Sequence, residues 1–139
     1  MNKKNTNYLL KNYKSLYKEY YLPMTQTCLC WGFDFLDGWF GLLDKLSIAI
    51  TVIERKNKGL KVYCTQCKEK FGTLRWYYRL EAKKDFELSV YNEIENAIRI
   101  AENESSKTCE VCGKPGKLYS KGWCKVRCNK CFRKETNGK

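Results

Sequence analysis

The segments Cys109-Glu-Val-Cys112 and Cys128-Asn-Lys-Cys131 decide how the C-terminal part of this chain folds, and 15 residues separate them. Two Cys-x2-Cys pairs at this spacing are typical of a structural zinc site. Each pair turns back so that both sulfurs face one ion, and two pairs complete a tetrahedral shell of thiolates. Gly113 follows the first pair and has the backbone freedom that such a turn requires. The spacing therefore predicts one Zn²⁺ ion in a small ribbon over residues 107–132.

A second candidate set of ligands, which would raise the number of zinc ions to two, consists of Cys28, Cys30, Cys64 and Cys67. Its geometry is less favourable, because a regular strand over residues 60–67 would point residues 64 and 67 to opposite faces. Buried free cysteines that pack as small apolar residues explain the same four positions equally well. The sequence alone leaves both interpretations open.

The length and the cysteine count limit the class of protein. The chain has 139 residues, which is enough for one domain, or for a small domain with an appended ribbon. Its nine cysteines are an odd number, and its first residues lack the apolar segment of a secretory signal. The longest apolar run, residues 48–53 interrupted by Thr51, is too short to cross a bilayer. We therefore expect a reduced, cytosolic protein with no membrane partner, in which Cys124 is a spare thiol.

The positive charge is concentrated near the C-terminus. Of the net charge of +12, residues 1–21 carry +4 and residues 107–139 carry +8, whereas residues 22–106 are neutral. A basic ribbon beside a neutral body predicts an anionic partner. The alternative is a lysine-rich composition that merely reflects an AT-rich genome. For an anionic partner, the expected contacts in the ribbon are Lys114, Lys117, Lys121, Lys125, Arg127 and Lys130.

Apolar periodicity predicts an α+β body over residues 1–106, with helices packed on a short antiparallel β-hairpin. Asp37 fits the N-cap of the central core helix. The polar residues 133–139 indicate a flexible tail after the ribbon. The expected elements of the body are a helix over 6–21, a helix over about 39–57, strands over 60–67 and 73–80 around a turn at 68–72, and a helix over about 85–103.

The hairpin is a second candidate surface for an anionic partner. Lys68, Lys70, Arg75 and Arg79 flank the aromatic residues 76–78, and such a mixture of bases and rings can stack nucleobases while it neutralises phosphates. A strand with one buried face and one solvated face has the same pattern. We also expect the ribbon to dock on the body, with Trp123 as its anchor, because about 25 residues cannot bury its large apolar side chains alone.

Enzymatic classes are disfavoured by what the chain lacks. It contains no histidine, which excludes a Ser-His-Asp triad and a Cys-His dyad. A metal site closed by four cysteines leaves no position for a water or a substrate. Asp34, Asp37 and Asp44 are the remaining candidates for a metal-dependent enzyme, but such carboxylates more often cap a helix or face solvent. The sequence therefore predicts that the protein is not an enzyme.

Four sequence blocks in this order resemble a family of small phage and prophage proteins, and the resemblance covers roughly residues 30–131. The blocks are Phe33-Asp-Phe-Leu-Asp-Gly-Trp-Phe-Gly-Leu-Leu-Asp-Lys-Leu46, Lys68-Glu-Lys-Phe-Gly-Thr-Leu-Arg-Trp-Tyr-Tyr78, Thr108-Cys-Glu-Val-Cys-Gly-Lys-Pro-Gly116, and Gly122-Trp123 followed by the second cysteine pair. The resemblance implies a phage-encoded accessory protein with a C-terminal zinc module. Cys64, Cys67 and Cys124 depart from the family pattern, which argues against a family-wide role for a second metal.

Phage accessory proteins of this size are often inhibitors of host defence or modulators of host machinery, which is an analogy between classes of protein. We therefore expect a protein that acts in the cytosol of a bacterial host. Its expected partner is a host protein or ribonucleoprotein complex, such as a nucleic-acid-guided antiviral defence system, which it binds and inhibits or modulates. The alternative is a nucleic-acid-binding accessory protein in phage transcription or replication.

Overall fold

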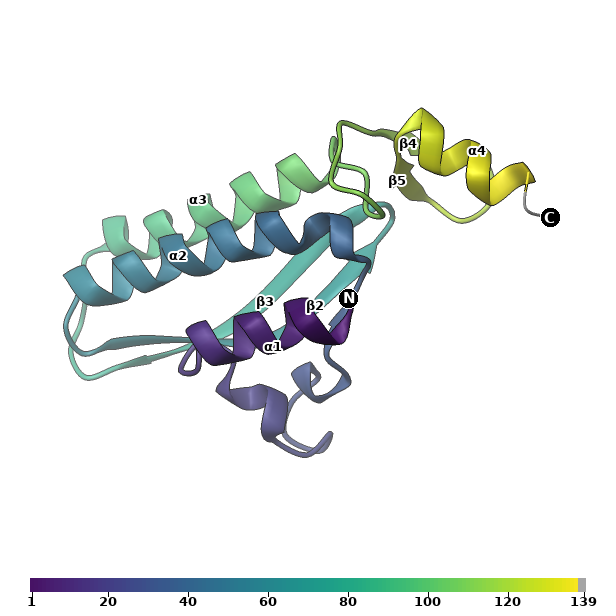
Figure 1. Ribbon diagram of the computed structural model, residues 1–139. Coiled ribbons are helices and arrows are strands. Elements are labelled where there is room, and N and C mark those ends of the chain that lie inside the picture. Colours follow the sequence, from purple (N-terminus) through teal and green to yellow (C-terminus); the bar gives the residue numbers. More distant parts are fainter. Residues whose placement is uncertain (138–139) are drawn as a thin grey trace.

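A long β-hairpin organises the fold, and two helices cover one face of it in the computed structural model, which describes residues 1–137 (Figure 1). The strands are β2 (Leu60–Lys70) and β3 (Thr73–Ala82), and they pair in antiparallel register along their whole length. Every second residue of β3 from Leu74 to Leu80 turns its side chain to the helices, as the pleat of a strand requires. The predicted α+β architecture is confirmed.

The turn of this hairpin has an unusual conformation. Phe71 and Gly72, the two residues between the strands, have φ angles of 53° and 80°, which is the conformation of a type I′ turn. Glycine adopts such angles freely, whereas the Cβ of phenylalanine makes them unfavourable. The turn is shorter than predicted and both strands are longer, because the ladder continues to Lys70 and Thr73.

An irregularity in β2 changes what its cysteines contact. The pairing register shifts between Cys64 and Gln66, so that one extra residue is inserted into β2. Cys64 and Cys67 consequently both lie in the core, whereas a regular strand would have pointed them to opposite faces. The short strand β1 (Phe33–Asp34) pairs in parallel with the same part of β2 and completes a three-stranded sheet in the order β1-β2-β3.

Two long helices, α2 (Phe40–Lys56) and α3 (Leu88–Ser105), lie side by side on the sheet and confirm the two helices predicted there (Figure 1). Asp37 is not the N-cap of α2, which corrects the prediction. It begins a 3-10 turn before the helix, and its carboxylate accepts hydrogen bonds from the Asn2 backbone N–H (2.8 Å) and the Asn5 side chain (3.0 Å). Among the described helices, none is both long enough and apolar enough to cross a membrane.

The predicted helix over residues 6–21 is wrong, because the chain forms two shorter pieces. The first is α1 (Lys3–Asn12), and the second is a 3-10 turn, η1 (Lys18–Tyr21). Between them, the Leu16 carbonyl accepts a hydrogen bond of 2.9 Å from the Cys64 N–H at the irregularity of β2. The amphipathic pattern is real, but the sheet binds this backbone and stops the helix.

The C-terminal segment contains a two-stranded sheet, β4 (Lys117–Tyr119) and β5 (Lys125–Arg127), followed by α4 (Asn129–Asn137). Residues 133–137 are therefore helical, which corrects the predicted flexible tail, and residues 138–139 lie outside the described part of the chain. Contacts with the strands explain why α4 forms. The Phe132 ring stacks on the Tyr119 ring with centroids 3.7 Å apart, and Glu135 accepts hydrogen bonds from both basic residues of β5.

The hairpin turn generates a stability prediction. Phe71→Asn should raise the free energy of unfolding by about 1 kcal/mol. Asparagine tolerates the left-handed conformation, and the substitution creates the Asn-Gly pair that type I′ turns favour. Phe71→Val removes the same ring but puts a β-branched residue at positive φ, so it should lower the stability. Urea unfolding measures both, and a Phe71→Asn protein no more stable than the parent would contradict the proposed backbone cost.

Candidate metal centre and adjoining cleft

The four cysteines of the two Cys-x2-Cys pairs meet at one point. Their sulfur atoms all lie within 4.8 Å of one another, and the Sγ atoms of Cys112 and Cys128 are 3.7 Å apart. Around an ion with bonds to sulfur of about 2.3 Å, tetrahedral ligands lie about 3.8 Å apart. The cluster therefore fits a metal ion, and the predicted ligand set of Cys109, Cys112, Cys128 and Cys131 is brought together.

The backbone of each cysteine pair explains how its sulfurs converge. After the first pair, Gly113 has a φ of 74° and donates its N–H to the Cys109 carbonyl at 2.9 Å. In the second pair, the Cys131 N–H lies 3.5 Å from the Cys128 sulfur, and this contact is the main reason why the pKa of Cys128 is lowered to about 7. Burial and hydrogen bonds to the other sulfurs raise the pKa of Cys131 to about 12. A divalent cation would take the place of the protons that these thiols share.

The ribbon docks on the body through the sequence Asp37-Gly38-Trp39. The Gly38 N–H donates to the Glu110 carbonyl at 2.7 Å, and the Trp39 indole N–H donates to the Thr108 carbonyl at 2.8 Å. A Cβ at position 38 would lie only 2.1 Å from the Cys109 carbonyl oxygen. Docking was predicted, but the anchor is the buried Trp39 and not Trp123, which is 81% exposed.

A buried ion pair joins the first cysteine pair to β5. Arg127 donates from Nη1 to Glu110 Oε2 at 2.8 Å and from Nε to Glu135, and the second carboxylate oxygen of Glu135 accepts from Lys125 at 2.6 Å. Glu110 also accepts from the Leu36 N–H at 3.2 Å. Burial opposes the charge of Arg127, but its hydrogen bonds to Glu135 and Glu110 outweigh this and raise its pKa.

These contacts correct the predicted anion-binding set. Arg127 is buried and forms salt bridges with both Glu110 and Glu135, so its charge is neutralised inside the protein. Lys125 is half-buried and paired with Glu135. The remaining predicted bases of the ribbon are exposed and form no salt bridge within residues 1–137, and they are Lys114, Lys117, Lys121 and Lys130.

A cleft of about 410 Å³ lies where the hairpin turn meets the turn between β4 and β5. Two of its lining side chains are large and exposed, Phe71 by 70% and Trp123 by 81%. Gly72 lies directly against the ribbon, because a Cβ there would lie 2.5 Å from Leu118 Cδ1 of β4. The full lining is Lys68, Glu69, Lys70, Phe71, Gly122, Trp123 and Cys124.

The fold thus brings together the hairpin and the ribbon, which the sequence analysis treated as alternative surfaces for an anionic partner. Lys68 and Lys70 of the hairpin line the same cleft as the ribbon turn that follows Lys121. Arg75, the third predicted base of the hairpin, instead lies 3.9 Å from Glu102 of α3. Sequence reasoning missed Phe71 as a functional candidate, although a phenylalanine before the glycine of a two-residue turn is a detectable signal.

The second cysteine set does not assemble, because the cluster described above is the one group of three or more possible ligands that converges within residues 1–137. Cys28 is exposed and Cys30 is partly buried, whereas Cys64 and Cys67 lie in the core, where burial raises the pKa of both thiols. The alternative interpretation, free cysteines packed as apolar residues, describes the last two.

The acidic candidates do not assemble either in the described part of the chain. Asp37 binds the start of α1, as described above. The Asp44 carboxylate accepts a hydrogen bond of 2.5 Å from the Tyr13 hydroxyl, and Asp34 lies exposed on β1. The structure therefore offers no convergence of these three carboxylates on one point.

No protein-family model, curated protein or solved structure matches the chain. The resemblance to phage proteins therefore stays a prediction from the sequence blocks. Those blocks do meet in the fold, because Gly38 of the first contacts Cys109 of the third, and Gly72 of the second contacts Leu118 near the fourth.

The docking contact generates a prediction with a matched control. Gly38→Ala should lower the free energy of unfolding by about 1–3 kcal/mol, because its Cβ overlaps the Cys109 carbonyl and the backbone must shift. Gly41→Ala lies three residues on, in α2, with nothing within 4 Å of the added Cβ. It should raise the stability by up to about 1 kcal/mol. Equal stability of the two variants in urea would contradict the docking contact.

Proposed function

We propose that this protein is a zinc-stabilised binding protein, without catalytic activity, whose cleft takes a single-stranded nucleic acid. One observation carries this proposal: two exposed aromatic rings, Phe71 and Trp123, line a cleft that also contains Lys68 and Lys70. Bases of a single strand stack on such rings, and lysines beside them neutralise phosphates.

Zinc is the proposed ion because of the donor set. Four thiolates in a tetrahedral arrangement select zinc or an iron–sulfur centre, and the paired x2 spacing is that of zinc ribbons. Four protein ligands fill the shell, so no position is left for a reactive water. The ion would then stabilise the fold of the ribbon and hold the turn that carries Trp123 against the hairpin.

The charge of the cleft and of its surroundings supports an anionic partner. Residues 107–139 contain ten basic and two acidic residues, and both acidic residues form salt bridges with Lys125 or Arg127. The other eight bases keep a formal charge of +8, which four thiolates around Zn²⁺ lower to about +6. In the cleft, the one acid is Glu69, and its carboxylate accepts from the Gly72 N–H at 2.5 Å.

The exposure of the two rings favours a role in stacking on a ligand over a role in packing the protein interior. An exposed tryptophan and an exposed phenylalanine in one cleft leave apolar surface in water, which marks binding sites more often than structural positions. Phe71 also has the unfavourable backbone conformation described above. Unfavourable local conformations persist mainly at functional sites.

Two cellular settings use the same surface. A host ribonucleoprotein complex presents single-stranded RNA, so a phage-encoded protein with this cleft would bind and modulate such a complex, including a nucleic-acid-guided defence system. A role in phage transcription or replication would use a single strand of the phage. Recovery of partners from infected host lysate with and without nuclease separates them, since subunits of a host ribonucleoprotein that ribonuclease releases support the first setting.

The ion generates a prediction on composition and on folding. Protein purified without added metal should contain one zinc per chain by elemental analysis. Cys112→Ser should lose the ion and unfold residues 107–132, because metal binding and folding are linked in such modules. Cys124→Ser removes the one other ribbon thiol and should keep both. A metal content near zero in the parent protein would contradict the site.

The cleft generates a prediction on affinity. Trp123→Ala and Phe71→Ala should each weaken binding of an oligonucleotide of about 12 nucleotides by about 5- to 150-fold, since one stacked base contributes about 1–3 kcal/mol. Fluorescence anisotropy of a labelled strand measures the affinity. Trp31→Ala is the control, because Trp31 is equally exposed at 72% but lies on the body outside the cleft.

Charge is tested by a second pair of variants with equal change in net charge. Reversal of Lys68 and Lys70 to Glu should abolish binding, whereas reversal of Lys83 and Lys84, past the other end of β3, should weaken it only slightly. Duplex of the same length should bind less tightly, because its bases are already stacked. Equal losses from both reversals, or a Trp31→Ala loss equal to that of Trp123→Ala, would remove the cleft from the proposal.

A further inference from the structure

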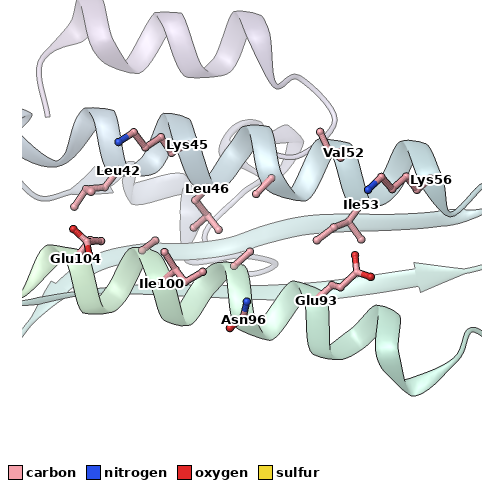
Figure 2. Close-up of a pocket in the computed structure, with 13 residues that line it drawn as sticks. Leu42, Lys45, Leu46, Val52, Ile53, Lys56, Glu93, Asn96, Ile100 and Glu104 are labelled. Carbon is pink, nitrogen blue, oxygen red and sulfur yellow. The ribbon is translucent and has the colours of Figure 1, made fainter.

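A second surface, which shares no lining residue with the cleft, lies on the outer side of the two long helices. A groove of about 580 Å³ runs between α2 and α3 (Figure 2). Its floor is apolar, and Val52 and Ile100 on its edges are 39% and 54% exposed. The apolar lining comes from Leu42, Leu46, Ala49, Val52, Ile53, Ala97, Ile100 and Ala101. Apolar surface of this kind on a helix pair marks an interaction site.

The charged residues along this groove are sorted by helix. Lys45 and Lys56 come from α2, and Glu93 and Glu104 come from α3. Figure 2 shows Lys45 and Glu104 at one end of the groove, and Lys56 and Glu93 at the other. None of the four forms a salt bridge within residues 1–137. Their charges are therefore available to a partner.

The spacing of these charges is the same on both helices. Lys45 and Lys56 are 11 residues apart, and so are Glu93 and Glu104. Eleven residues are close to three helical turns, or about 16 Å along the axis, so each pair lies on one face of its helix. Two basic positions on α2 therefore match two acidic positions on α3 in spacing and opposite charge.

We propose that this groove is the interface of a homodimer in which α2 of each chain packs on α3 of the other. With the two-fold axis parallel to the helices, Lys45 faces Glu104 of the partner subunit and Lys56 faces Glu93 of the partner subunit. The symmetry repeats both pairs, so that four ion pairs surround a shared apolar core. An axis across the helices would place lysine against lysine, so the charges select one orientation.

The self-matching charge pattern favours a second copy over another kind of protein. A single amphipathic helix laid in the groove would need its own acidic and basic edges in the opposite order, and nothing in the chain specifies such a helix. Residues 22–106, which include both helices, carry no net charge. The two helix faces therefore bring no net charge together, and the charge of the chain lies in the N-terminal segment and the ribbon.

Sedimentation velocity with charge-reversed variants tests the homodimer. One variant has Lys45→Glu and Lys56→Glu, so that both edges of the groove are acidic, and a second has Glu93→Lys and Glu104→Lys, so that both are basic. Each alone should dimerise at least about tenfold more weakly than the parent, because like charges then face each other. An equal mixture of the two should form a heterodimer, and one chain with all four substitutions should dimerise as the parent does.

The charge reversals should change association without changing the fold. All four side chains are exposed, so circular dichroism should show unchanged folding. Lys58→Glu with Asp85→Lys changes exposed charges outside the groove and should leave association unchanged. A parent protein that sediments as a monomer at about 0.1 mM, which implies a Kd weaker than about 0.1 mM, overturns the proposal. So does a mixture of the two variants that fails to associate.

Discussion

The contact of Gly38 with the peptide of Cys109 and Glu110 is the constraint on which the arrangement of this protein depends. A side chain at this position has no space, because a Cβ would lie 2.1 Å from the Cys109 carbonyl oxygen. The residues on either side extend the contact in two directions: Asp37 binds the start of α1, and Trp39 enters the core while its indole N–H binds Thr108. One tripeptide thus connects the N-terminus, the core and the first cysteine pair.

This connection gives a structural metal site an effect beyond the ribbon. The ion would hold the start of α4 next to the loop of the first two cysteines. The buried ion pair between Glu110 and Arg127 would in turn fix β5 to that loop. The turn before β5 carries Trp123 to the hairpin, where Gly72 packs on Leu118. The cleft therefore exists only while the ribbon is folded, so binding of a metal and binding of a ligand would be coupled through folding.

Local patterns in the sequence were enough to predict much of this fold. Cysteine spacing identified the four cysteines that converge, and apolar periodicity identified α2, α3 and the hairpin, because these features depend on neighbours in the chain. The errors depend on distant partners. A hydrogen bond from the Cys64 N–H interrupts the helix predicted over 6–21. Salt bridges to Glu110 and Glu135 bury Arg127. Trp39, and not Trp123, anchors the ribbon to the body. No periodicity encodes such pairings.

The two proposed surfaces affect each other through the geometry of the body. The ribbon contacts the end of the helix pair where α2 begins and α3 finishes (Figure 1), which is the end that carries Lys45 and Glu104. A two-fold axis parallel to the helices keeps that end in common, so both ribbons of a dimer lie together. Their positive charges then repel, and a polyanion that spans the two clefts removes this repulsion. Because such coupling is reciprocal, a single strand would strengthen the dimer by the same factor as dimerisation strengthens binding of the strand.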